Sequence, residues 1–289
     1  MKTLRQRLVP YGLMGPGLIW LFVFFVIPMY FMGQLSLKTG SLGAGYELTW
    51  AFENYTDSIS QYSDQFLRAF YYAGVASFLC LLIGYPLAYA IAFKAGRWKN
   101  LMLFAVVAPF FTTYLIRTIA WKTLLDDTSP IVSVLKFLQI VPQDGRVLAT
   151  SGAVIAGLTY NFLPFMVLPL FASLERLDRR LLEAGKDLYA SAAQTFWRIT
   201  LPLTAPGIIA GVLLTFIPAA GDYVNVIFLG GTKQAMIGNV IQSKYLVVND
   251  YPDAAALSFT LMAIILVALI IYIKFAGTGA LMGDEEEAT

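Results

Sequence analysis

The sequence predicts an all-α integral membrane protein that crosses the bilayer six times. Of the 289 residues, 58% are hydrophobic and only 13% are charged, and the mean hydropathy is +0.68. Uncharged apolar runs of roughly 18 or more residues are typical of transmembrane helices. A β-barrel is disfavoured because the runs are continuous and do not alternate with a period of two. The stretches without Asp, Glu, Lys or Arg are residues 8–37, 69–93, 100–116, 147–174, 199–221 and 254–273.

Charge and residue usage exclude several other classes of protein. The formal net charge of only +2 and the high hydropathy argue against a disordered chain and against a soluble nucleic-acid-binding protein. The chain contains no His, so a His-ligated metal site and a His general base are excluded, and the single Cys80 cannot form an internal disulfide. We therefore predict one transmembrane domain over residues 1–289, without a metal site or a bound cofactor.

The first three predicted spans cover about residues 13–36, 69–93 and 101–125. The first follows three basic residues and is either a signal peptide or a retained anchor. A retained anchor is favoured, because the apolar run is longer than a usual signal-peptide core and no small-x-small cleavage pattern precedes Lys38. The polar segment 38–67 is expected to lie outside, with a short amphipathic helix on the membrane surface.

The last three predicted spans cover about residues 149–173, 204–229 and 254–275. Gly207 and Gly211 form a small-xxx-small pair, which favours close packing against another helix. Proline interrupts nearly every span, which indicates either ordinary kinks or helices that surround a pathway. These prolines are Pro28, Pro86, Pro109, Pro164, Pro169, Pro206 and Pro218.

The basic residues predict the orientation. Twelve of the 20 lie at the N-terminus, in segments 94–99 and 174–200, and at Lys274. Cytoplasmic loops carry an excess of Lys and Arg, so both termini are expected in the cytoplasm, which six spans satisfy. The acidic C-terminal tail is read as a solvated end.

The long cytoplasmic segment between the fourth and fifth spans has helical character. Leucines from Leu174 to Leu188 recur along one face. Ser191 followed by Gln194 is a capping-box pattern that predicts the start of a second short helix, and Pro202 ends it. The apolar face must be buried against the protein's own bundle or against a partner protein, and composition alone leaves both open.

This segment resembles the EAA loop of ABC-importer permeases, written E-A-A-x3-G-x9-I-x-L-P. The resemblance implies the type I importer permease (MetI-like) fold and a loop of residues 174–201 that docks on an ATP-hydrolysing subunit. Gly185 stands where a second Ala is usual, and Tyr189 where Gly is usual. Because a left-handed backbone costs a Tyr about 1–2 kcal/mol, we expect the turn to shift onto Ala190 and Ser191. The residues that the resemblance assigns to ATPase coupling are Leu181, Glu183, Ala184, Gly185, Asp187, Tyr189, Ile199, Leu201 and Pro202.

Three further segments, at residues 163–170, 201–211 and 218–224, are similar to spermidine/putrescine permeases of the PotB and PotH type. The similarity extends over about residues 15–275. It implies half of an import pathway for a small cationic polyamine in the bacterial inner membrane. It also implies a second homologous permease, paired ATPase subunits that bind the ATP, and an extracytoplasmic substrate-binding protein.

The chain itself is expected to be non-catalytic. It has no G-x4-G-K-[ST] pattern for binding ATP phosphates and no nucleophile with a His base. Arg117 and Asp222 are ionisable residues at membrane depth, and such residues normally face a partner or a wet cavity. One reading gives them structural roles, in which they either pair with each other or snorkel, so that the charged group reaches the membrane surface. The other places Asp222 and Tyr223 in the substrate pathway with Arg117, and Tyr160 is a further aromatic candidate, as are Tyr114 and Trp121.

Two other functions remain open at this stage. An importer permease for iron, sulfate, molybdate or a sugar would share the loop and the spans. An ion-coupled secondary transporter would require inverted repeats and more acidic residues within the spans. The single Asp in the spans and the long coupling loop argue against this reading. A membrane enzyme is disfavoured, because the chain has no His and the spans have no paired acids.

Overall fold

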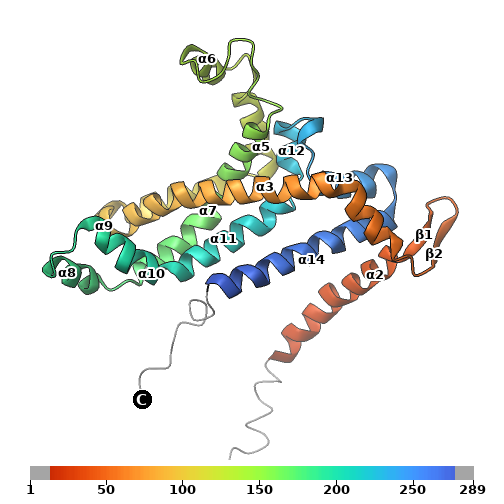
Figure 1. Ribbon diagram of the computed structural model, residues 1–289, viewed down its shortest axis with the longest axis horizontal. Coiled ribbons are helices and arrows are strands. Elements are labelled where there is room, and N and C mark those ends of the chain that lie inside the picture. Colours follow the sequence, from red (N-terminus) through yellow and green to blue (C-terminus); the bar gives the residue numbers. More distant parts are fainter. Residues whose placement is uncertain (1–13, 277–289) are drawn as a thin grey trace, which may run out of the picture. The chain divides into compact units, whose positions relative to one another are not determined.

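The computed structural model describes residues 14–276 (Figure 1). These residues form two compact units. The first consists of residues 14–63 and 240–262, and the second of residues 64–239 and 263–276. Both are mainly helical, as the sequence predicts.

The first unit begins with an apolar helix over Met14–Ser36, which includes the π-helical segment Phe22–Val26 and α2 (Ile27–Ser36). A hairpin follows, in which β1 (Lys38–Ser41) pairs with β2 (Gly45–Leu48) in antiparallel register. Gly40 has φ +132°, and a Cβ there would lie 2.1 Å from the carbonyl oxygen of Gly45. The segment 38–67 therefore begins with a hairpin that requires glycine at position 40. The sequence predicts a short amphipathic helix in this segment and does not predict the hairpin.

The helix α3 (Glu53–Tyr89) starts well before the second predicted span, and the π-helical segment Ala90–Lys94 continues it. At Tyr62 the backbone leaves helical geometry (φ −116°, ψ 20°). This kink separates a polar first part from the apolar remainder of the helix. The helix therefore extends well beyond the predicted span of residues 69–93, because polar residues at a membrane boundary do not stop a helix.

The third predicted span is broken. A 3₁₀ turn (Gly96–Trp98), α4 (Lys99–Val107) and a second 3₁₀ turn (Ala108–Phe111) form one arm, and α5 (Tyr114–Leu124) is the other, at 95° to the first. Pro109 lies in the turn before the break, and the side chain of Thr113 accepts a hydrogen bond from the Ile116 N–H at the start of α5 (3.4 Å). Proline and an N-cap side by side therefore end one helix and begin another.

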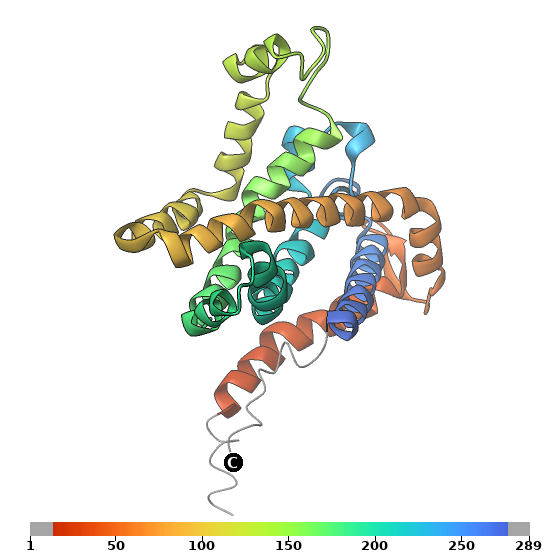
Figure 2. The same cartoon turned by 60° about the vertical axis from the view of Figure 1, so that its left-hand side comes forward.

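The second unit also contains α6 (Pro130–Phe137) and the long α7 (Ser151–Glu175), which holds Pro164 and Pro169. The helix α11 (Ala205–Ala220) runs beside α7 (Figures 1 and 2). A Cβ at Gly207 would lie 2.8 Å from the Pro169 carbonyl oxygen, and one at Gly211 would lie 2.6 Å from Met166 Sδ. The small-xxx-small pair therefore packs one helix against another, as predicted.

After α11 come α12 (Val224–Leu229), a 3₁₀ turn (Thr232–Gln234), α13 (Ile237–Ser243), a π-helical segment (Lys244–Val248) and α14 (Tyr251–Ala276). Four helices of the described chain are long and apolar enough to cross a membrane: Met14–Ser36, Glu53–Lys94, Ser151–Glu175 and Tyr251–Lys274. Two bent pairs, at Gly96–Leu124 and Ala192–Ala220, raise the number to six if each counts as one span.

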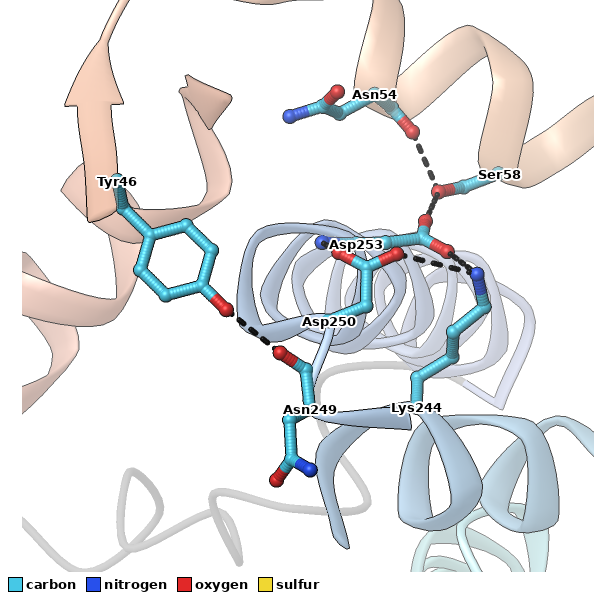
Figure 3. A network of polar contacts seen from close by, with 7 residues as sticks. All are labelled: Tyr46, Asn54, Ser58, Lys244, Asn249, Asp250 and Asp253. Atoms are coloured by element: carbon cyan, nitrogen blue, oxygen red, sulfur yellow. Dashed lines mark hydrogen bonds and ion pairs between the residues drawn. The ribbon is translucent and has the colours of Figure 1, made fainter. Parts of the chain in front are cut away.

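A polar network holds the outer parts of the first unit together (Figure 3). The Lys244 ammonium contacts Asp253 at 2.7 Å and Asp250 at 3.3 Å, and Ser58 Oγ donates to Asp253 Oδ1 (3.0 Å). Burial opposes the charge on Lys244, but its hydrogen bond to Asp253 and the charges of Asp253, Tyr62 and Asp250 outweigh burial and raise the pKa of Lys244 above its usual range.

The hairpin is tied to the same network. Tyr46 on β2 donates its hydroxyl to the Asn249 carbonyl oxygen (2.6 Å), and Asn54 Nδ2 donates to the carbonyl oxygens of Ser36 and Lys38 (2.8 and 3.1 Å). Segments almost 200 residues apart in sequence are therefore fixed to each other by side chains.

Candidate functional site

The cytoplasmic loop predicted from the EAA pattern forms two short helical pieces. The first is α8 (Arg179–Asp187). The second joins α9 (Ala192–Thr195), the π-helical segment Phe196–Thr200 and α10 (Leu201–Leu203). Ser191 and Gln194 form the predicted capping box: Ser191 Oγ accepts from the Gln194 N–H (3.2 Å) and Gln194 Oε1 accepts from the Ser191 N–H (2.9 Å). The helix–turn–helix prediction is confirmed.

The turn between the two pieces lies at Tyr189, which has φ +57°. The Leu188 N–H donates to the Ala184 carbonyl oxygen (3.1 Å) and the Ala190 N–H donates to that of Gly185 (3.0 Å), which closes the end of α8. The predicted shift of the turn onto Ala190 and Ser191 was therefore wrong. Because Ser191 is fixed in extended geometry by its capping box, only Tyr189 is left to take the left-handed conformation, at a cost of about 1–2 kcal/mol.

The predicted coupling residues fall into an inner and an outer set. Gly185 is buried, and a Cβ there would lie 3.1 Å from Ile199 Cδ1, so these two positions hold the two pieces together. Leu201 is half-buried. Leu181 is 46% exposed and stands between the two sets, since it lines a cavity of about 620 Å³ beside α7 and α11. The outer set is solvent-exposed and consists of Glu183, Ala184, Asp187, Tyr189 and Pro202.

Cationic side chains anchor the base of this loop to the helix ends beside it. Lys99 forms an ion pair with Glu175, and its Nζ lies 5.3 Å from the ring centre of Phe171. Arg179 donates to the Ala92 carbonyl oxygen (3.4 Å). Arg179 therefore ties the start of α8 to the helical segment that continues α3, and the Lys99–Glu175 pair joins the start of α4 to the end of α7.

The hydroxyl groups of Tyr85 and Thr204 are hydrogen-bonded (2.8 Å) on the other side of the loop. Both residues are buried. This contact fixes the start of α11 against α3.

A second polar cluster lies where α11 and α12 are separated, at Asp222. The carboxylate accepts hydrogen bonds from the Tyr114 hydroxyl, the Asn225 N–H (2.8 Å) and Asn225 Nδ2 (3.3 Å). Asn225 Oδ1 in turn accepts from Asn161 Nδ2 on α7 (3.2 Å). With only 8% of Asp222 exposed, the cluster ties α5, α7 and α12 together by hydrogen bonds inside an apolar region.

Arg117 and Asp222 form no direct ion pair in the part of the chain that the structure describes. The Arg117 guanidinium is 8% exposed and lies over the rings of Phe110 (5.1 Å) and Tyr114 (5.7 Å). Tyr114 therefore stands between the two charges, with its ring toward the cation and its hydroxyl toward the carboxylate. Direct pairing, one of the two predictions, was wrong.

The remaining predicted pathway residues are not part of this cluster of hydrogen bonds. The side chain of Tyr223, next to Asp222, is exposed, and Tyr160 packs its ring 5.3 Å from that of Trp121. Sequence reasoning missed Asn161 and Asn225, which complete the cluster. Both stand within predicted spans, where an amide side chain needs a hydrogen-bonding partner, and that was the available signal.

Comparison with known proteins gives one family over almost the whole chain. The profile described as "Binding-protein-dependent transport system inner membrane component" matches residues 7–278. The chain is 39% identical over 257 residues to the "Spermidine/putrescine transport system permease protein PotB" of Haemophilus influenzae, covering 89% of each protein. It is 38% identical over 254 residues to the protein of that name in Escherichia coli, covering 88% of this chain and 92% of the relative.

Two solved structures share the fold at low sequence identity. The chain matches a bacterial alginate ABC transporter in complex with an alginate pentasaccharide-bound periplasmic protein at a TM-score of 0.68, with 19% identity and 98% of each chain covered. The MetNI methionine ABC transporter matches at a TM-score of 0.50, with 15% identity, 76% of this chain and 94% of that chain covered. The predicted MetI-like permease fold is thereby confirmed.

Proposed function

The chain belongs to the family of binding-protein-dependent transport system inner membrane components, and we propose from this premise that it is the spermidine/putrescine permease subunit of an ATP-driven importer. The assignment of the substrate rests on the 38–39% identity to PotB permeases over about nine-tenths of the chain. The chain is a non-catalytic, multi-pass subunit, and the ATP is bound and hydrolysed by a partner.

Three partners complete the transporter in this proposal. A second homologous permease supplies the other half of the pathway, an extracytoplasmic binding protein delivers the polyamine, and a pair of ATPase subunits docks in the cytoplasm on residues 174–201. The exposed outer set of that loop, with Glu183 and Tyr189, supports the docking role. Both chain termini are placed in the cytoplasm by the distribution of basic residues.

The loop transmits the closure of the ATPase pair to the membrane helices. Its base is held by the Lys99–Glu175 ion pair and by the hydrogen bond between Tyr85 and Thr204. Because α7 and α11 pack closely at Gly207, a displacement of the loop moves both helices as one body. Alternation between inward-facing and outward-facing states then follows from rocking of the two permeases against each other.

The cluster at Asp222 is the proposed contact for the cation during transport. A polyamine carries ammonium groups, which a carboxylate and aromatic faces can receive in place of water. In the arrangement seen here, Tyr114 and Asn225 donate hydrogen bonds to the Asp222 carboxylate. We propose that an ammonium group replaces these donors as the helices move, with Tyr223 beside it and Arg117 held away by its aromatic contacts.

Uptake of labelled spermidine and putrescine tests the substrate. Cells that lack their own polyamine importer are complemented with this permease and its partners, and unlabelled spermidine, putrescine, ferric citrate, sulfate, molybdate or maltose is added as competitor. We expect only the polyamines to compete. Competition by an anion or a sugar alone would assign the permease to another solute.

Two variants test the residue roles. The double variant Leu181→Asp with Glu183→Ala is expected to abolish uptake and binding-protein-stimulated ATP hydrolysis, and full activity would remove the loop from coupling. Asp222→Asn keeps one acceptor oxygen for the Asn225 N–H, replaces the oxygen that accepts from the Tyr114 hydroxyl with an NH2 donor, and removes the charge. We expect at least tenfold slower uptake. Asp144→Asn, at an exposed outer position, is the matched control. Unchanged uptake in Asp222→Asn would remove Asp222 from the path.

A further inference from the structure

Tyr189 has an energetically unfavourable backbone that its own side chain does not offset. Its φ of +57° is the conformation that glycine adopts freely and that a residue with a Cβ adopts at a cost. The two hydrogen bonds that close the turn use the backbones of Leu188 and Ala190, and glycine at position 189 would allow both. The turn therefore supplies no reason for a tyrosine.

The Tyr189 side chain also makes no stabilising contact within residues 14–276. It is 97% exposed and forms neither a hydrogen bond nor an aromatic pair with any side chain that the structure describes. An aromatic ring that is 97% exposed at a strained position stabilises nothing in the part of the chain that the structure describes. A partner molecule can supply the contact that these residues do not.

The loop that carries Tyr189 exposes side chains of the kinds that form protein interfaces. Leu188 is 80% exposed and Trp197, on the second helical piece, is 65% exposed. Tyrosine and tryptophan are enriched among the residues that dominate binding energy, because each offers a large rigid ring at low entropic cost. The exposed charges of Glu183 and Asp187 lie on the same loop and would form a polar rim.

The charged rim argues against lipid as the occupant of this surface. Burying carboxylates such as Glu183 and Asp187 among acyl chains would cost free energy, because lipid tails offer no hydrogen bonds. A protein interface with an apolar centre and a polar rim leaves such carboxylates solvated. Within the second unit the loop lies away from α12 (Figure 1). Of the three proposed partners, the cytoplasmic ATPase subunit is the one that docks on this loop in the proposed function.

We propose that Tyr189 is an anchor residue that inserts its ring into a pocket of the ATPase subunit and so helps to select that partner. The inference rests on the proposed function, because it assumes that residues 174–201 contact the ATPase. Tyr189 strains the turn, at which the family usually has glycine. The contact of its ring with the ATPase subunit offsets that strain only in the complex.

The test uses Tyr189→Gly in the full-length permease pair reconstituted in nanodiscs, with two readouts that the proposal moves in opposite directions. Relief of the positive φ is expected to raise the Tm of the permeases before the ATPase subunit is added. Loss of the ring is expected to weaken ATPase-subunit binding at least tenfold and to lower binding-protein-stimulated ATP hydrolysis at subsaturating ATPase concentrations. Tyr189→Phe should keep most of the affinity, since it retains the ring.

Gln139→Gly is the matched control. Gln139 also has a positive φ (+58°), but it follows α6 and is distant in sequence from the loop. It should raise the Tm and leave ATPase binding unchanged. Unchanged ATPase binding in Tyr189→Gly would overturn the proposal, as would a fall in the Tm of the permeases, because the ring would then stabilise the permease itself.

The variant with Leu181→Asp and Glu183→Ala separates the two levels of the argument. If that double variant still binds the ATPase subunit, the loop is not the interface and the proposed coupling function fails. If it loses binding while Tyr189→Gly retains it, only the anchor role of Tyr189 fails.

Discussion

The contact between α7 and α11 is predicted to fail when Gly207 is replaced by leucine. The first added carbon would lie 2.5 Å from Ser173 Cβ and 2.8 Å from the Pro169 carbonyl oxygen. Both distances are far below van der Waals contact, and the second involves backbone that cannot rotate away. The three further carbon atoms of leucine would have to enter a region that the two helices already fill, so α11 must move away from α7.

The cost is that of overpacking a dense interior, about 1–3 kcal/mol. At about 2–4 °C per kcal/mol for a chain of this size, the Tm should fall by roughly 2–12 °C. Transport should fall further than stability, because the loop of residues 176–204 joins these two helices and its position depends on their contact. Uptake at a temperature well below the Tm of the variant separates the two effects.

Thermal unfolding of the reconstituted permease, followed by tryptophan fluorescence, measures this change. Gly74→Leu is the matched control, since a Cβ at this α3 position meets no atom within 4 Å. We expect the control to keep its Tm within about 2 °C and to keep its uptake. Equal behaviour of Gly207→Leu and Gly74→Leu would refute the reasoning, because it would mean that α7 and α11 are not in close contact in the assembled protein.

Three further predictions concern the coupling loop and the outer network. Gly185→Ala, which restores the usual EAA sequence, should raise stability by about 0.5–1 kcal/mol through helix propensity. The added methyl group would lie 3.1 Å from the flexible end of the Ile199 side chain, which can move aside, and a lower Tm would show that it cannot. Lys244→Met should destabilise by about 1–3 kcal/mol, since it leaves two partly buried carboxylates without their cation, whereas Lys233→Met, at an exposed position, should not change the Tm. Because the pKa of Lys244 is raised in the folded protein, its ion pairs stabilise the fold fully below its unfolded pKa of about 10.4. This stabilisation is lost only as the pH rises through the higher folded pKa. A fall in Tm between pH 7 and 9 that Lys244→Met abolishes would contradict the assignment.

The sequence was most informative where one physical requirement dominated. Charge-free runs identify the apolar helices because a charge within the bilayer is costly, and Ser191 with Gln194 identified the start of α9 because those side chains satisfy free backbone N–H groups. The EAA spacing identified the loop, and a Cβ at Gly185 would lie 3.1 Å from Ile199 Cδ1, which shows that the two ends of the motif lie close together.

The features that were missed depend on contacts between distant segments. Periodicity did not reveal the 95° break before Tyr114, because a proline such as Pro109 kinks some helices and ends others. The hairpin at Gly40 is fixed by side chains such as Tyr46, whose partner Asn249 lies some 200 residues away. The turn at Tyr189 was misplaced because propensity argues against a tyrosine there, and propensity was overridden by the hydrogen bonds that end α8 and begin α9.

The two helix breaks explain why an acid is present at Asp222. Ending a helix within the bilayer leaves backbone N–H groups that must find an acceptor, and the Asp222 carboxylate accepts one of them, from Asn225 at the start of α12. The same carboxylate accepts the hydroxyl of Tyr114, the first residue after the other break. One side chain thus joins the broken ends of two helices, and removal of its donors would release both. The carboxylate of Asp222 therefore has two separable roles, as a cap that asparagine can replace and as a charge that it cannot. For this reason Asp222→Asn, and not Asp222→Ala, distinguishes a pathway carboxylate from a purely structural one.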